Sequence, residues 1–335
     1  MSTRTALVLG ATGGIGGEVA RTLKGRGWTV RALHRDAARA GLRDGIQWIT
    51  GDALSPIDVT AAADGASLLV HAVNPPGYRN WGSLVLPMLD STLAAARSSG
   101  ARILLPGTVY NYGPDALPNP DELSVQHPVT AKGRIRVEME RRLLRAAEAG
   151  HSTAVVVRAG DFFGPRAANN WFSQGLVKPG KRPASIAYPG RPDVGHQWAY
   201  LPDVAETMVR VIETRSLGNF ATFHMEGHWD PNGMRMVEAI RRVVGAPDLP
   251  VRRLPWTLMR LLGPVVPLFR ELAEMRYLWE QPVRMRNDRL LALIGEEPRT
   301  PLDDAVRATL IGLGCLGAAA NANASALATA SQGRV

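Results

Sequence analysis

Cysteine is almost absent from this sequence, because Cys315 is the single cysteine in 335 residues. One thiol excludes an intramolecular disulfide framework and a cysteine-held metal cluster. We therefore expect no metal site. We also expect a cytoplasmic protein, since a reducing compartment fits a chain that uses no disulfides.

Long hydrophobic runs are also missing. The first apolar run, residues 6–9, is too short for the core of a signal peptide. The longest apolar stretch, residues 254–272, is interrupted by arginines and prolines. Such a stretch cannot cross a bilayer, so the sequence predicts no integral membrane segment. We expect it to form a helical lid or wall of a pocket.

Lysine is scarce although the chain is basic, with a formal net charge of +9. The lysines among the 39 basic residues are Lys24, Lys132, Lys178 and Lys181. The many arginines are scattered and form no run with interleaved aromatic residues, so we expect no nucleic-acid partner. The positive charge is compatible with a phosphate-bearing ligand.

The order of segments predicts an α/β protein. Strand-like and helix-like segments alternate through the first half, which is the pattern of parallel βαβ units. The strands are apolar at most positions, as in a sheet that is covered on both faces. We expect strands at residues 5–9, 29–33, 47–49, 67–73, 102–105 and 154–158, and helices at residues 15–26, 84–97 and 134–149.

The second half is less regular. Helix-like patterns occur at residues 204–214, 234–244 and 301–313, and residues 175–191 have the glycine, proline and basic content of a loop-dominated insertion. We expect residues 1–165 to form a dinucleotide-binding core, which a strand and a helix near residues 198–225 rejoin. Residues 166–317 are then mainly a substrate-binding lobe, and residues 318–335 a disordered tail.

A glycine-rich turn follows the first strand and opens the first helix. This arrangement lets backbone amides approach a pyrophosphate at a helix N-terminus, where the helix dipole favours an anion. The sequence therefore predicts a Rossmann fold that binds NAD(H) or NADP(H). We expect the phosphate cradle to consist of Gly10, Thr12, Gly13, Gly14, Ile15 and Gly16.

The end of the second strand bears on the choice of cofactor. An acidic residue there binds the ribose hydroxyls of NAD, whereas an arginine suits the 2′-phosphate of NADP. The strand ends in His34 and Arg35, followed by Asp36. We favour NADP(H), bound by His34 and Arg35, while Asp36 leaves NAD(H) open.

Two further turns are candidates for cofactor contacts. Asp52 and Ala53 follow the third strand, and we expect them to lie against the adenine. Asn74 follows the fourth strand, and we expect it to line the ribose or the nicotinamide. Both turns stand at the carboxyl ends of strands, where open α/β sheets bind their ligands.

These turns and several later motifs resemble the extended short-chain dehydrogenase/reductase family, which includes nucleotide-sugar epimerases and dehydratases. The resemblance covers residues 5–314. It implies a doubly wound parallel sheet with a bound nicotinamide cofactor, a smaller C-terminal lobe for a small-molecule substrate, and a homodimer through helices 84–97 and 134–149. The motifs are Gly10–Gly16, Gly51–Leu54, Thr108–Gly113, Arg158 with Phe163–Pro165, and Trp198–Ala205.

The family's catalytic unit is a serine or threonine and a Tyr-x-x-x-Lys motif at the start of the helix after the fifth strand. Thr108 matches the serine or threonine. The tyrosine motif is missing, and counting back from Glu138 places Thr130 and Arg134 at its two positions. A threonine hydroxyl is too weak an acid to replace a phenol, and an arginine does not exchange protons.

Lys132 is the first candidate to fill this gap. Residues 132–140 also resemble the isoflavone-reductase-like branch of atypical short-chain reductases, which uses a lysine and lacks the tyrosine. A buried lysine shifts its pKa readily and can act as an acid or a base. Tyr110 is a second candidate, and the histidines at positions 71, 127 and 196 are further acid–base candidates without the spacing of a metal site.

Three functions stay open at this point. We favour an oxidoreductase of atypical mechanism that transfers hydride to or from a small carbonyl or hydroxyl substrate. A non-catalytic NADP(H)-binding sensor or assembly factor is the alternative, and a nucleotide-sugar epimerase or dehydratase is a second one. The residues expected around the substrate are Arg166, Asn169, Asn170, Trp171, Lys178, Arg182, Arg191, His196 and Trp198.

Overall fold

The computed structural model describes residues 4–40, 45–75, 80–167, 170–214, 216–262, 265 and 273–317. The expected tail at residues 318–335 lies outside the described residues. Residues 263, 264 and 266–272 of the apolar stretch 254–272 also lie outside them. No helix in the described part of the chain is long and apolar enough to cross a membrane.

A seven-stranded parallel sheet organises the larger part of the molecule, with the strand order β10-β6-β5-β4-β1-β2-β3. Its strands are β1 (Thr5–Leu9), β2 (Thr29–His34), β3 (Gln47–Thr50), β4 (Leu68–His71), β5 (Arg102–Thr108), β6 (Thr153–Ala159) and β10 (Phe220–His224). The predicted doubly wound fold is confirmed. The order reverses between β1 and β4, and such a switch point is where open parallel sheets bind ligands.

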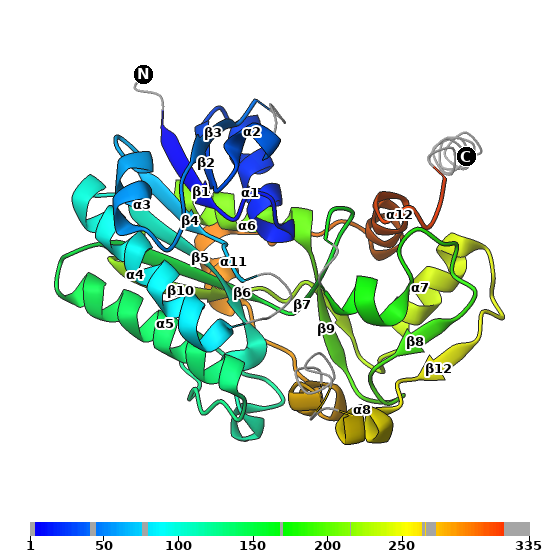
Figure 1. The fold of residues 1–335 in the computed structure, drawn as a ribbon. Helices are drawn as coiled ribbons and strands as arrows, with labels where there is room; N and C mark the ends of the chain where they lie inside the picture. The colour runs from blue at the N-terminus through cyan, green and yellow to red at the C-terminus, as the bar shows by residue number, and fades with distance from the viewer. Residues whose placement is uncertain are drawn as a thin grey trace.

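Helices cover both faces of this sheet (Figure 1). They are α1 (Gly14–Gly25), α2 (Ala37–Ala40), α3 (Pro56–Ala62), α4 (Trp81–Ser99), α5 (Ala131–Glu148), α6 (Leu201–Glu213) and α11 (Asp288–Ile294). Strand β1 shows why both faces must be covered, because its side chains alternate between two separate cores. Ala6 and Val8 pack with α1 and α6, whereas Leu7 and Leu9 pack with α3, α4 and α5.

Helix α3 was not predicted, although its start carries a local signal. Ser55 caps the helix by accepting a hydrogen bond from the Asp58 amide, and Pro56 occupies the first turn. The Asp58 carboxylate accepts a hydrogen bond from the Asp52 amide at 2.9 Å. This bond ties the turn that contains Asp52 to the first turn of α3.

The later part of the chain returns to the sheet. Strand β10 pairs in parallel with β6, α6 packs on α1, and α11 packs on β10 and α6. These contacts explain why the apolar residues of α6 and the buried Leu290 of α11 belong to the same core as β1 and β2.

A second, smaller lobe lies beside the sheet (Figure 1). It holds a three-stranded sheet, β7 (Asp161–Phe163), β9 (His196–Tyr200) and β11 (His228–Asp230), and a pair, β8 (Ile186–Tyr188) with β12 (Val251–Arg253). Its helices include α7 (Arg235–Val244), α8 (Trp256–Leu262), α10 (Tyr277–Glu280) and α12 (Leu302–Gly312). The segment at residues 175–191, expected to be dominated by loop, is mostly loop and contains the short strand β8, which pairs with β12.

Candidate active site

The glycine turn after β1 fits tightly against the end of β4. Gly10 has a φ of 90°, and a Cβ added there would lie 2.5 Å from the Ala72 carbonyl oxygen. A Cβ on Gly16 would lie 2.3 Å from the Gly10 carbonyl oxygen. Both positions therefore require glycine, and the turn brings the first helix to the switch point of the sheet.

The N-terminus of α1 is available to an anion. Its N-cap is Gly13, which has no side chain to bond the first amides, and the first turn has no acidic residue. Thr12 and Gly13 are exposed at the tip of the turn. Unbonded first-turn amides and the helix dipole favour a phosphate at this point. The residues of the cradle thus fit the pyrophosphate of a dinucleotide.

The ends of β2 and β3 form the next part of the same edge. The Nδ1 atom of His34 lies 2.8 Å from the Asp36 carbonyl oxygen and 3.0 Å from its amide nitrogen, so the turn holds the imidazole. Arg35 is exposed beside it. Asp52 accepts a hydrogen bond from the Leu54 amide at 3.0 Å through one carboxylate oxygen. Ala53, which is half-buried, lies in the same turn as Asp52.

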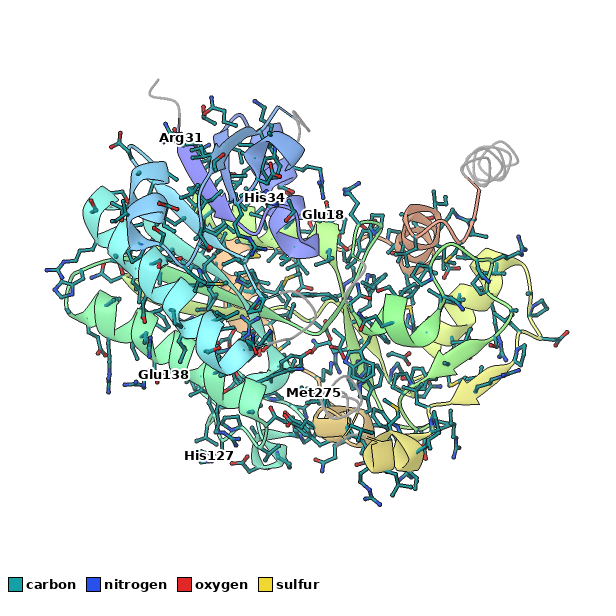
Figure 2. All side chains as sticks on the ribbon, viewed as in Figure 1. Glu18, Arg31, His34, His127, Glu138 and Met275 are labelled. Carbon is teal, nitrogen blue, oxygen red and sulfur yellow. The ribbon has the colours of Figure 1, made fainter. Side chains whose placement is uncertain are left out.

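An ion pair between buried Glu18 and exposed Arg166 ties the second lobe to the cradle. Glu18 of α1, labelled in Figure 2, lies at the boundary between the sheet and the second lobe. Its carboxylate accepts two hydrogen bonds from Arg166, at 2.9 and 2.8 Å, and pairs with Arg21 at 3.0 Å. A Cβ on Gly14 would lie 3.0 Å from the Cβ of Ala167. The segment at Arg166 and Ala167 therefore closes over the first turn of α1.

Thr108 ends β5 and lines a pocket at the carboxyl edge of the sheet. Its hydroxyl oxygen accepts a hydrogen bond from the Tyr110 amide at 3.3 Å, which leaves the hydroxyl hydrogen for a ligand. The residues that line the pocket come from the ends of β5 and β6, from β7 and from the start of the second lobe. They are Thr108, Val109, Tyr110, Ala159, Gly160, Asp161, Phe162, Asn170 and Trp171.

Helix α5 begins directly beside this pocket. Buried Thr130 is its N-cap, and the threonine hydroxyl accepts a hydrogen bond from the Gly133 amide at 3.0 Å. A Cβ on Gly133 would lie 2.3 Å from the Tyr110 carbonyl oxygen, so the first turn of α5 packs on the chain that follows Thr108. The position of Thr130 is explained by helix capping.

Lys132 and Arg136 lie one turn apart on the inward face of α5. Lys132 is 5 % exposed and Arg136 8 %. The Lys132 ammonium lies 5.8 Å and the Arg136 guanidinium 5.3 Å from the centre of the Trp81 ring. Arg136 also donates to the Asn74 side-chain oxygen and to the Pro106 carbonyl, each at 3.4 Å. Arg136 thus lies between the ends of β4 and β5, and both cations face the Trp81 ring.

The helix register corrects the predicted alignment. Arg134 is exposed, because two residues of a helix turn the side chain by about 200° away from its inward neighbours. Glu138, from which that alignment was counted, lies on the outer face and pairs with Arg142 at 2.8 Å. The inward glutamate is Glu140, which binds Arg158 of β6. Counted from Glu140, the two motif positions are occupied by Lys132 and Arg136 instead of Thr130 and Arg134.

Comparisons with known proteins show the family of the chain. A model of the NAD dependent epimerase/dehydratase family matches residues 6–223, which is more than half of the chain. The chain belongs to this family. A 3-diazoavenalumate denitrifying reductase from a Streptomyces species is 29 % identical over 278 residues, which cover 77 % of this chain and 86 % of that protein. Family and relative make the chain an NAD-dependent enzyme.

Solved structures share the fold of this epimerase/dehydratase family member. MoeE5 in complex with UDP-glucuronic acid and NAD has a TM-score of 0.73 at 17 % identity, covering 92 % of this chain and 98 % of that one. The UDP-glucuronic acid 4-epimerase from Bacillus cereus in complex with NAD has a TM-score of 0.72 at 14 % identity, with the same coverage. At these identities the likeness concerns the fold.

The histidine candidates differ in their surroundings. Burial, and then the charge of Arg136, lower the pKa of His71 to about 3, so this ring is neutral near pH 7 and is no proton donor there. His127 is exposed and pairs with Asp115 at 2.7 Å. His196 is buried and lies 2.9 Å from Asp161, which lines the pocket.

The structure brings together only part of the predicted substrate set. Asn170 and Trp171 line the pocket, and Trp198 is buried in the aromatic core of the second lobe. Lys178, Arg182 and Arg191 are exposed, and Asn169 lies outside the described residues. Sequence reasoning missed Arg136, Asp161 and Phe162. For Arg136 there was a signal, because it stands four residues after Lys132, on the same face of a helix.

Proposed function

We propose that this family member is an NADP(H)-dependent reductase that transfers hydride to a small carbonyl-type substrate with Lys132 in place of the family's tyrosine. The observation that carries the proposal is the buried pair of Lys132 and Arg136 on the inward face of α5. The reductase activity in the name of the 29 % identical relative supports the same direction.

The residues divide the chemistry as follows. The nicotinamide, when bound, supplies the hydride, and the protein has to orient the substrate and manage charge and the proton. The Thr108 hydroxyl donates a hydrogen bond to the substrate oxygen. The Lys132 ammonium donates a proton to that oxygen as the substrate carbon is reduced, so a C–H and an O–H bond form while the C=O π bond is lost. Lys132 then regains its proton from water.

Arg136 has a different task, because a guanidinium does not give up a proton. Its contacts with Asn74 and with the Pro106 carbonyl hold it between the ends of β4 and β5. We assign Arg136 the roles of binding ribose hydroxyls and of supplying positive charge to the site.

The sharpest test follows the hydride itself. NADPH carrying deuterium at C4 is incubated with the protein and a metabolite extract, and the products are examined by mass spectrometry. A reductase transfers one deuteron to a product carbon and consumes the cofactor stoichiometrically. An epimerase returns hydride to its substrate and consumes no cofactor, so turnover without net NADPH loss would replace this proposal by the epimerase alternative.

We further propose that His34 and Arg35 select NADP(H), because an exposed arginine at this strand end suits a 2′-phosphate. Arg35→Ala is expected to raise the Kd of NADPH about tenfold. This corresponds to about 1.4 kcal/mol for the loss of one charge-assisted contact at the surface. The Kd of NADH should change less than about threefold. Fluorescence titration with both cofactors measures this. Exposed Arg97 on α4 gives the control Arg97→Ala, and an unchanged Kd for NADPH in Arg35→Ala would refute the preference.

A further inference from the structure

The pocket beside Thr108 contains one carboxylate among aromatic walls. Asp161 is 7 % exposed and lines the pocket together with Tyr110, Phe162 and Trp171. Strands β5 and β6 run side by side with Thr108 opposite Ala159, so Asp161 stands two residues beyond the partner of Thr108. The hydroxyl and the carboxylate therefore face one ligand space.

His196 fixes this carboxylate. Its Nε2 atom lies 2.9 Å from Oδ2 of Asp161, and both side chains are buried. The imidazole stacks on Trp279 at 3.7 Å between ring centres with 10° between the planes. Its Nδ1 atom is buried and has no hydrogen-bond partner among the described residues. Because a carboxylate oxygen only accepts, Nε2–H of His196 is the donor in this contact.

The Asp161 carboxylate keeps hydrogen-bonding capacity beyond its contact with His196. One oxygen of Asp161 accepts from His196, and a carboxylate has lone pairs for further donors. Asp161 is 7 % exposed, and burial strengthens a hydrogen bond to its carboxylate and makes the approach of an anion costly. The pocket thus has the chemistry to accept a flat apolar group that carries a hydrogen-bond donor.

We propose that Asp161, positioned by His196, anchors an aromatic substrate through a hydroxyl or amine hydrogen on its ring, and that the pocket disfavours anionic groups at this point. The inference rests on the proposed reductase function for the reacting carbonyl, and it adds the substrate class. Trp171 extends the same wall to α8, since its ring lies 6.2 Å from that of Trp256.

Binding of three para-substituted benzaldehydes to the NADP⁺-loaded protein tests the proposal without turnover. Isothermal titration calorimetry should give 4-hydroxybenzaldehyde a Kd about tenfold lower than that of 4-methoxybenzaldehyde, because the methoxy group has no hydrogen-bond donor. The 4-carboxybenzaldehyde should bind most weakly. Equal or stronger binding of the carboxylate probe, or no binding of any probe at millimolar concentration, would overturn the anchor.

Asp161→Asn provides the matched change in the protein, since it removes the charge and keeps the size. The preference for the hydroxy probe over the carboxylate probe should fall at least about tenfold, while the Kd of NADPH and the melting temperature stay close to those of the wild type. An unchanged preference would overturn the proposal. The probe ranking in the wild type is an independent measurement should the variant fold poorly. If the wild type binds the probes in the expected order but transfers no hydride, the reductase function is refuted and the role of Asp161 as an anchor is supported.

Discussion

Lys132→Met is expected to lower kcat of the reduction by about 10²–10⁴-fold, the usual contribution of a positioned proton donor. Methionine keeps the length and the apolar stem of lysine over the Trp81 ring but has no proton to give. The KM for the substrate should change much less, because Thr108 and the rest of the pocket still bind it. Stopped-flow measurement of NADPH oxidation at saturating substrate separates the two parameters.

Two matched variants decide what Lys132 contributes. Lys132→Arg restores the positive charge over Trp81 but not an exchangeable proton, so its kcat should stay within about tenfold of that of Lys132→Met. Recovery of most of the activity in Lys132→Arg would mean that the site needs the charge alone. Exposed Lys24 on α1 gives the control Lys24→Met, which should behave as wild type. Full turnover in Lys132→Met would eliminate the proton-donor role.

The sequence was a reliable guide where the chemistry is local. The run Thr5–Leu9 predicts a buried strand and the glycines after it predict a tight turn, because a continuous apolar run and glycine geometry act within a few residues. The return of α6 and β10 to the sheet was predicted as well, through the resemblance to a known family.

The register of helix α5 could not be predicted from the sequence alone. Glu138 and Glu140 are two residues apart in one helix, and both are plausible references for the motif. They differ in burial and partner: Glu140 is 6 % exposed and binds Arg158, whereas Glu138 pairs with arginines on the outer face. That difference depends on how α5 packs on β6, which is a tertiary contact.

The pairing of Asp161 with His196 could not be predicted from the sequence either. The two residues are separated by 35 positions and meet because β7 and β9 are neighbours in the small sheet. A short strand such as β7, residues Asp161–Phe163, gives too few positions for a periodic pattern. The choice of its partner strand is made by the aromatic core of the second lobe, where Phe163 packs with Trp198.

A buried ionic network holds α5, and with it Lys132, on the sheet. Arg158 is fully buried in β6 and donates to Glu140 at 3.1 Å from Nε and again from Nη2. Its Nη1 lies 3.1 Å from the Tyr112 hydroxyl and 3.0 Å from Nε2 of His224. Burial and the guanidinium lower the pKa of His224 to about 3, so this histidine is neutral and the carboxylate is the counter-charge.

Arg158→Met is therefore expected to destabilise the protein by about 3–5 kcal/mol, because it leaves the Glu140 carboxylate buried without a counter-charge. Urea denaturation followed by tryptophan fluorescence measures the loss. Arg142→Ala removes surface pairs with Asp90 at 2.6 Å and Glu138 at 2.8 Å and should cost at most about 1 kcal/mol. The double variant Arg158→Met/Glu140→Met removes both charges and should be more stable than the sum of its single variants predicts. A loss in Arg158→Met no larger than that in Arg142→Ala would show that the buried pair does not hold α5 in place.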